Sequence, residues 1–276
     1  MGERFLLCAL LSGCAVFTHF SARANDLPDP ETAIWGQIKR SLFGNRPVSN
    51  DPQGIVELVA PARAEDAAVV PVAIRTRLAQ RPERYIRRIY LIVDNNPLPL
   101  AAMIELTPES GRADLETRIR IEQYTYVRAV AELSDGKLVA DARFVKAAGG
   151  CSAPAGKDPA AAAARLGRMR LAVEGDVSYN QPVLAQLMIS HPNDSGLVMD
   201  QLTRLFTPAY FVRSINVTYA GKPILSAAVD FSISENPNFR FYFVPAGEGE
   251  LKAQALDTKD LKFETRLIVR RGARPD

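Results

Sequence analysis

Cys151 is the residue of this chain whose type and position could do chemistry; residues 146–157 around it read KAAGGCSAPAGK. The chain has three cysteines, and the other two, Cys8 and Cys14, lie in an apolar N-terminal leader that we expect to be removed. Paired cysteines of exported proteins form disulfides, whereas a single cysteine has no partner within its chain. The pattern therefore indicates a free thiol that is kept for sulfur chemistry.

Residues 5–20 of the leader are almost wholly apolar, and Ala-Arg-Ala follows at 22–24. A short apolar run before an A-x-A site is typical of a secretory signal peptide, so residues 1–24 are predicted to be cleaved and the protein to be periplasmic. A transmembrane helix needs roughly 20 apolar residues, and no later segment is long and apolar enough. The alternative is lipoprotein processing at Cys14, which would anchor the chain by a lipid and still leave Cys151 as the free thiol.

The segment around Cys151 has the composition of a flexible arm. Gly149 and Gly150 permit positive φ and wide backbone motion, and Pro154 opposes regular structure beyond them. Residues 147–168 are rich in alanine and glycine and cannot bury enough apolar surface to offset their conformational entropy. We therefore predict an arm that presents an exposed Cys151, whose reactive form is the thiolate.

His191 is the only histidine outside the leader and the candidate base for a Cys–His pair. A catalytic cysteine needs a rigid, supported site, which a flexible arm does not provide, so a turn histidine at a strand end is the favoured interpretation. A thiol hydrolase or peroxidase that uses Cys151 and His191 is the alternative. No metal site is predicted, because no ligand-spaced cluster is present, and no phosphate loop or dinucleotide motif indicates a cofactor.

The composition is that of a soluble globular protein, with 47% hydrophobic and 24% charged residues. A net charge of +3 is close to balanced, which argues against nucleic-acid binding. The length of 276 residues allows one large or two smaller domains, each able to bury a core.

Short runs rich in Val, Ile and Tyr dominate the first half, at 69–74, 85–93, 100–106, 117–121, 126–133 and 138–145. Asp135 and Gly136 separate the last two runs and form a hairpin signal. Between 117 and 122 the pattern alternates, so Ile119 and Ile121 are predicted to face one way and the charged residues beside them the other. Evenly spaced short strands of this kind indicate an antiparallel sandwich.

Strand patterns resume after the arm, at 169–173, 183–189, 212–219, 223–231, 239–244, 251–256 and 261–269. One helix is predicted at 30–42, with Trp35 packing onto the sandwich. The predicted fold is therefore all-β, with two immunoglobulin-like β-sandwich domains at 25–146 and 169–276. A short N-terminal helix and the flexible inter-domain arm at 147–168 complete it.

These residues resemble the SoxY and SoxZ carriers of bacterial sulfur oxidation. Residues 144–151, FVKAAGGC, resemble the mobile Gly-Gly-Cys-Gly-Gly arm that ends SoxY, and residues 30–151 resemble SoxY more loosely. Residues 170–268 resemble SoxZ in order and spacing, through Ser190-His-Pro with Gly196, PAYF at 208–211, VTYAGK at 217–222, and SENP at 234–237 with Phe239 and Phe241. The whole chain resembles the fused SoxYZ-like carriers associated with quinoprotein dehydrogenases.

The resemblance implies a periplasmic carrier that is not itself an enzyme. Cys151 would hold sulfur intermediates covalently and present them to periplasmic sulfur-oxidation enzymes or c-type cytochromes, and the SoxY-like and SoxZ-like domains would pair within the chain. Two features depart from the family: the arm is internal, and Ser152 and Ala153 replace the two glycines after the cysteine. The alternative is a non-covalent accessory protein of a periplasmic quinoprotein alcohol dehydrogenase. No cofactor, metal, nucleic acid or membrane span is expected.

Overall fold

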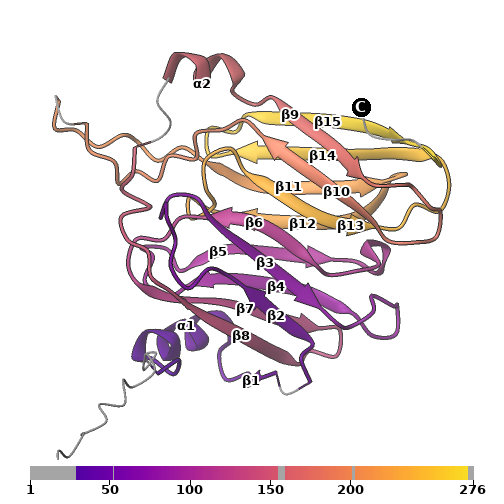
Figure 1. The fold of residues 1–276 in the computed structure, drawn as a ribbon, viewed down its shortest axis with the longest axis horizontal. Coiled ribbons are helices and arrows are strands. Elements are labelled where there is room, and N and C mark those ends of the chain that lie inside the picture. Colours follow the sequence, from indigo (N-terminus) through magenta and orange to yellow (C-terminus); the bar gives the residue numbers. More distant parts are fainter. Residues whose placement is uncertain (1–28, 52, 155–158, 201–202, 273–276) are drawn as a thin grey trace, which may run out of the picture.

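A computed structural model describes residues 29–51, 53–154, 159–200 and 203–272 (Figure 1). The predicted signal peptide, with Cys8 and Cys14, lies outside the described residues. Within the described part of the chain, no helix has the length and apolar character that crossing a membrane requires.

The first half of the chain forms one helix and eight strands. They are α1 (Ala33–Phe43), β1 (Val48–Asn50), β2 (Val56–Val59), β3 (Val70–Thr76), β4 (Ile86–Val93), β5 (Leu100–Leu106), β6 (Leu115–Ile119), β7 (Thr125–Leu133) and β8 (Leu138–Val145), with a 3-10 turn at Pro108–Ser110. The β7–β8 hairpin confirms the turn predicted at Asp135 and Gly136, and Gly136 has the positive φ of 85° that such a turn requires.

The second half begins with a short helix and continues as seven strands. They are α2 (Pro159–Arg165), β9 (Met169–Glu174), β10 (Val183–Ile189), β11 (Val212–Tyr219), β12 (Lys222–Val229), β13 (Asn238–Phe243), β14 (Gly249–Asp257) and β15 (Lys262–Val269). Each of these strands overlaps a run that the sequence predicts.

The two halves share both sheets of the fold. The nine-stranded sheet has the order β1-β8-β7-β4-β5-β12-β11-β14-β15, and the six-stranded sheet has the order β2-β3-β6-β13-β10-β9. The halves join where β5 pairs with β12 and where β6 pairs with β13, in both cases antiparallel. The β-sandwich class is therefore confirmed, and the two sandwiches are joined edge to edge through both sheets.

One hydrophobic core runs between the sheets and across the junction of the halves. Strands with one buried face alternate as predicted, as in β10, where Val183, Ala185, Leu187 and Ile189 are buried and the residues between them are partly exposed. A single buried cluster contains residues of both halves, including the paired Leu115 and Phe241 of β6 and β13. The junction is therefore part of the core.

Helix α1 covers the outer face of β4 and β7. Its N-cap Thr32 accepts a hydrogen bond from the backbone N–H of Trp35 at 3.0 Å. Trp35, Ile38 and Phe43 pack with Tyr90 and neighbours in a second buried cluster. The same cluster includes Val130 of β7, and it confirms the predicted packing of Trp35 onto the sandwich.

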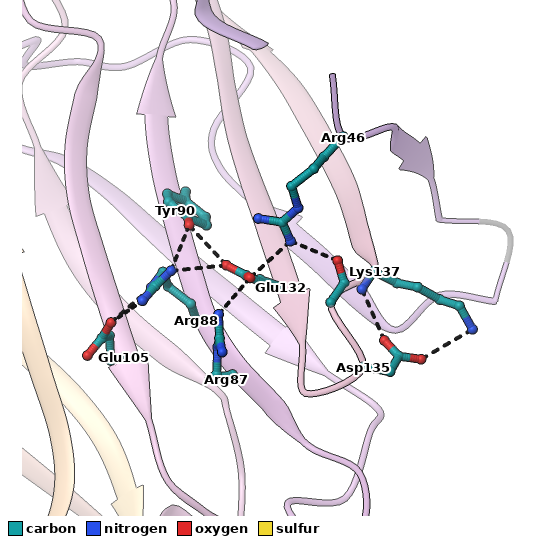
Figure 2. A network of polar contacts seen from close by, with 9 residues as sticks. Arg46, Arg87, Arg88, Tyr90, Glu105, Glu132, Asp135 and Lys137 are labelled. Carbon is teal, nitrogen blue, oxygen red and sulfur yellow. Dashed lines mark hydrogen bonds and ion pairs between the residues drawn. The ribbon is translucent and has the colours of Figure 1, made fainter. Parts of the chain in front are cut away.

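Glu132 lies at the far end of β7, within a network of charges on the same outer face (Figure 2). Its side chain is only 2% exposed and accepts hydrogen bonds from Arg46, Arg87 and Arg88 at 2.9–3.2 Å and from the Tyr90 hydroxyl at 3.0 Å. A buried carboxylate is thus surrounded by cationic and hydroxyl donors.

Candidate functional site

The segment that carries Cys151 follows β8 and packs along the turn between β6 and β7. The backbone N–H of Gly149 donates to the carbonyl oxygen of Glu122, and that of Gly150 donates to the carbonyl oxygen of Ile121, both at 2.9 Å. From here on, the arm means residues 147–153, the part of the predicted arm at 147–168 that carries Cys151. These backbone bonds fix its position against the first half of the chain.

The two glycines of the arm do not act as the flexible residues predicted from the sequence. They allow a close backbone contact and a left-handed φ. A Cβ atom on Gly150 would lie 2.0 Å from the carbonyl oxygen of Ala67, so only glycine allows this close approach. Gly149 has a φ of +81°, in the left-handed region, with open space around its Cα. Both glycines let the arm pack closely, which corrects the prediction of an unpacked tether for this segment.

The prediction that Cys151 is exposed is also wrong. Its exposed fraction is 0%, and it is the free cysteine of the described residues. The pKa of the thiol is raised to about 12, mainly by burial and also by the negative charge of Glu122, while the positive charge of Arg120 opposes both. In this conformation Cys151 is a protonated thiol that solvent does not reach, because the arm packs against backbone that the local composition did not reveal.

Glu122 accepts hydrogen bonds from the arm at Cys151 and at Ser152, the residue after it. Its Oε2 accepts hydrogen bonds from the backbone N–H groups of Cys151 at 2.9 Å and Ser152 at 3.2 Å. Its Oε1 accepts a hydrogen bond from the Ser152 hydroxyl at 2.5 Å. Ser152 is one of the residues that depart from the family pattern, and here its hydroxyl gives Glu122 a third donor.

The second half of the chain contacts the arm through the segment between β10 and β11. The Ser195 hydroxyl donates to the Cys151 carbonyl oxygen at 2.5 Å. Arg120, directly after β6, donates to the carbonyl oxygens of Gly150 at 3.3 Å and of Pro192 and Asn193 at 3.4 Å. Cys151 therefore lies where the two halves of the chain meet.

Asp230 adds a further charge that acts on Cys151. It follows β12 and accepts a hydrogen bond from the backbone N–H of Ser232 at 2.6 Å. Burial raises the pKa of Asp230 to about 7, so this carboxyl is close to half protonated at neutral pH. The charges of Arg120, Glu122 and Asp230 thus all act on the pKa of the thiol.

His191 is buried, and its ring nitrogens are directed at groups other than Cys151. Its Nδ1 accepts a hydrogen bond from the Asn193 backbone N–H at 3.1 Å, and its Nε2 lies 3.6 Å from Oδ2 of Asp257. The ring packs edge-on against Tyr210, with centroids 4.5 Å apart. Burial lowers the pKa of His191, although Asp257 opposes the shift. The structure therefore assigns His191 to the packing of the turn and does not pair it with the thiol.

Three residues of the site escaped the sequence analysis: Arg120, Glu122 and Ser195. The alternation of residues 117–122 predicts that Arg120 and Glu122 face away from Ile119 and Ile121, but β6 ends at Ile119 and the alternation ends with it. Arg120 is 2% exposed. Ser195 lies 44 residues from Cys151, and no local pattern links the two. The fold of the first half brings Arg120 and Glu122 to the arm, and the pairing of the two halves brings Ser195.

The described residues contain no group of three or more His, Cys, Asp or Glu side chains that could hold a metal ion. The chemistry available at this site is therefore that of a thiol, two nearby carboxyl groups and a guanidinium.

Two protein families match the chain. "Sulfur oxidation protein SoxY" matches residues 39–151, and "Sulphur oxidation protein SoxZ" matches residues 170–267. The first match ends at Cys151 itself, and the second begins one residue after the start of β9. No curated protein matches the chain.

Solved structures that match the chain include the sulfur carrier protein SoxY from Chlorobium limicola f thiosulfatophilum, which is 23% identical over 40% of this chain and 89% of that chain, with a TM-score of 0.34. The superoxide reductase (neelaredoxin) from Ignicoccus hospitalis is 12% identical over 33% of this chain and 78% of that chain, with a TM-score of 0.29. The fibronectin(III)-like modules of Clostridium thermocellum CbhA are 11% identical over 78% and 94%, with a TM-score of 0.24. These similarities support no inference about function, which rests on the two family matches.

Proposed function

We propose that this chain, which belongs to the fused SoxYZ-like proteins with a SoxY and a SoxZ domain in one polypeptide, carries sulfur intermediates bound covalently to Cys151. Partner enzymes act on the cargo, and the carrier itself catalyses no step. The observation that carries the proposal is the SoxY match, which extends into the arm and ends at this cysteine. The domain bounds 25–146 and 169–276 remain part of the same proposal.

A carrier with a buried thiol needs two arm positions. In the closed position, which the structure describes, Glu122 and Ser195 bind the arm on both sides of Cys151. Hydrogen bonds to a charged group contribute about 1.5–3 kcal/mol each, so breaking a few of them is within the range of local opening in a folded protein. The open position would expose Cys151 and return its pKa toward the ordinary value of a thiol.

The closed position gives the carrier an advantage in an oxidising compartment. A permanently exposed thiol would form disulfides with other proteins, whereas a protonated, buried thiol does not exchange. An open arm would expose Cys151 to loading by partner enzymes or c-type cytochromes, and closure would protect the cargo between partners. A periplasmic location agrees with the predicted signal peptide and is part of the proposal.

Replacement of Cys151 by serine and by alanine in the native host tests the carrier function. We expect both variants to fold and to abolish the protein's contribution to oxidation of a reduced sulfur compound, because neither side chain can form a bond to sulfur cargo. Thermal unfolding of the two purified variants serves as the control for folding. Sulfur oxidation that is unchanged in both folded variants would contradict a covalent role.

A second function is favoured by one observation, the complete burial of Cys151. If the arm never opens, the protein would be a non-covalent accessory of a periplasmic quinoprotein alcohol dehydrogenase, bound through the surfaces of the sandwich. Co-purification with such a dehydrogenase that survives Cys151→Ala, together with unchanged alcohol oxidation, would support this function over the carrier.

A further inference from the structure

Arg120 is a buried guanidinium without a carboxylate in contact. Its exposed fraction is 2%, and within residues 29–51, 53–154, 159–200 and 203–272 no carboxylate lies at ion-pair distance from it. Within the described residues, its side-chain hydrogen bonds reach the carbonyl oxygens of Gly150, Pro192 and Asn193, at 3.3–3.4 Å. Its Nε has no hydrogen-bond partner.

This arrangement is unfavourable for a purely structural arginine. Buried charges in proteins are normally paired, because an ion removed from water loses its hydration without compensation. Burial lowers the pKa of Arg120, and Glu235, Asp194 and Asp66 oppose the shift from a longer range. Since arginine stays protonated in proteins, a positive charge remains inside this site.

The backbone of Arg120 holds its side chain beside the arm. The N–H of Arg120 donates to the Ser232 carbonyl oxygen at 2.7 Å, and the Asn96 side-chain amide donates to the Arg120 carbonyl oxygen at 2.8 Å. The guanidinium binds the carbonyl oxygen of Gly150, the residue directly before Cys151. The backbone of Arg120 is therefore held in place, and moving its guanidinium away from the arm would break the bonds to the three carbonyl oxygens.

We propose that Arg120 is the receptor for an anionic sulfur group carried on Cys151, so that the closed arm selects cargo that ends in a fixed negative charge. This inference rests on the proposed carrier function and names the class of cargo. A sulfonate-terminated sulfane group is one member of that class, and its oxygens would satisfy guanidinium donors that now have long contacts or none.

The other charges around Cys151 make Arg120 necessary for such cargo. The negative charges of Glu122 and Asp230 both raise the pKa of the thiol, so alone they would oppose an anion on Cys151. The Oε atoms of Glu122 accept bonds from the arm, and Asp230 is bound to Ser232. Arg120 is the cation whose charge acts on Cys151, so it alone offsets this repulsion within the described part of the site.

The test compares two adducts on the chain that begins at residue 25, in which Cys151 is the only cysteine. With tetrathionate, the Cys151 sulfur bonds to an inner sulfur, the central S–S bond breaks, thiosulfate leaves with the electron pair, and the thiol proton goes to solvent. The product ends in a sulfonate. With methyl methanethiosulfonate, the same sulfur bonds to the methylthio sulfur and methanesulfinate leaves, which gives a neutral methylthio group. Intact mass confirms complete loading in each case.

We expect the sulfonate adduct of the wild-type protein to melt several degrees above the methylthio adduct, and we expect Arg120→Met to remove or invert this order. Arg118→Met is the matched control, because it removes an arginine two residues away that is partly exposed and binds the Asn236 carbonyl oxygen, and it should preserve the wild-type order. Arg120→Lys, which keeps the charge, should preserve part of the difference.

A methylthio adduct that is as stable as the sulfonate adduct in the wild-type protein would overturn the proposal, whether or not Arg120→Met folds. An equal effect of Arg120→Met on both adducts would also overturn it, because Arg120 would then only connect the surrounding loops. Both adducts are made with reagents, so the result is independent of whether the native protein carries sulfur. Loss of function in Cys151→Ser tests that separate claim.

Discussion

Arg128 and Arg120 are two arginines of the same half, 3% and 2% exposed, with opposite surroundings. Arg128 donates three hydrogen bonds to Asp94 at 2.7–3.0 Å and one to the Pro30 carbonyl oxygen at 2.6 Å, and it lies over the ring of Trp35. Arg120 has only long bonds to carbonyl oxygens. A buried charge with a counter-ion, such as Arg128, supports the fold. A buried charge without one near a thiol, such as Arg120, indicates a binding site whose ligand supplies the opposite charge.

The largest expected effect is a loss of stability at the ion pair of Arg128 and Asp94. Asp94→Asn leaves the guanidinium of Arg128 buried without its counter-charge, and breaking a buried pair in this way costs about 3–5 kcal/mol. Urea unfolding should show this loss. Arg120→Met in the unloaded protein should change stability by less than about 1 kcal/mol, because it removes weak bonds together with an unpaired charge. Equal losses in the two variants would erase the distinction between the two arginines.

The close packing of the arm is tested at its glycines. In Gly150→Ala the new Cβ would lie 2.0 Å from the Ala67 carbonyl oxygen, so the arm must move away from the β6–β7 turn. We expect roughly 1–3 kcal/mol of destabilisation, typical of overpacking, and a faster reaction of Cys151 with iodoacetamide. Gly149→Ala has space for its Cβ and a strained φ, so it should cost about 1 kcal/mol. An unchanged alkylation rate in Gly150→Ala would mean that the arm is not packed as described.

Glu122 is expected to control how often the arm opens. Glu122→Gln removes the charge from the bonds to Cys151 and Ser152, and a loss of about 1.5–3 kcal/mol corresponds to a rise in alkylation rate on the order of 10- to 100-fold. Glu65→Gln is the matched control, because it neutralises an exposed glutamate and should leave the rate unchanged. Equal rates in wild type and Glu122→Gln would show that other contacts keep the thiol closed.

A smaller effect, which depends on pH, is expected at the well-compensated Glu132. Burial alone would raise the pKa of Glu132, but the hydrogen bonds from Tyr90 and Arg46 outweigh it and the pKa is lowered. The charge therefore stabilises the fold at pH values above the ordinary glutamate pKa, and this stabilisation is lost as pH falls through the lower folded pKa.

Glu132→Gln should accordingly destabilise the protein at neutral pH, and the difference from wild type should shrink on acidification. Melting temperatures measured from pH 7 to pH 3 give the comparison. A difference that grows on acidification would contradict the lowered pKa.

Much of the fold follows from the sequence because strand patterns are local. The run predicted at 100–106 is β5, and the run predicted at 138–145 is β8, with the same bounds. The pairing of β5 with β12 joins residues more than 100 positions apart, and no local pattern specifies it. The continuous sheets are therefore a property of the folded chain that single-strand patterns do not contain.

The candidate site was predictable only in its cysteine. The Gly-Gly-Cys sequence and its family resemblance identify Cys151, but glycine content alone does not separate a mobile arm from one that packs closely. The difference lies in the Ala67 carbonyl oxygen next to Gly150 and in the Glu122 carboxylate beside Cys151, both distant in sequence. The alternation predicts only that Arg120 faces away from Ile119 and Ile121, and it ends with β6 at Ile119, so it does not reveal that Arg120 is buried.

The central claim is that Cys151 carries sulfur, and the most direct measurement is the intact mass of the protein purified from host cells that are oxidising a reduced sulfur compound. We predict a population with additional sulfur or sulfonate mass that maps to the peptide of Cys151, disappears on reduction, and is absent from Cys151→Ser. A bare thiol on Cys151 in every sample, under conditions where the host oxidises sulfur, would contradict the claim.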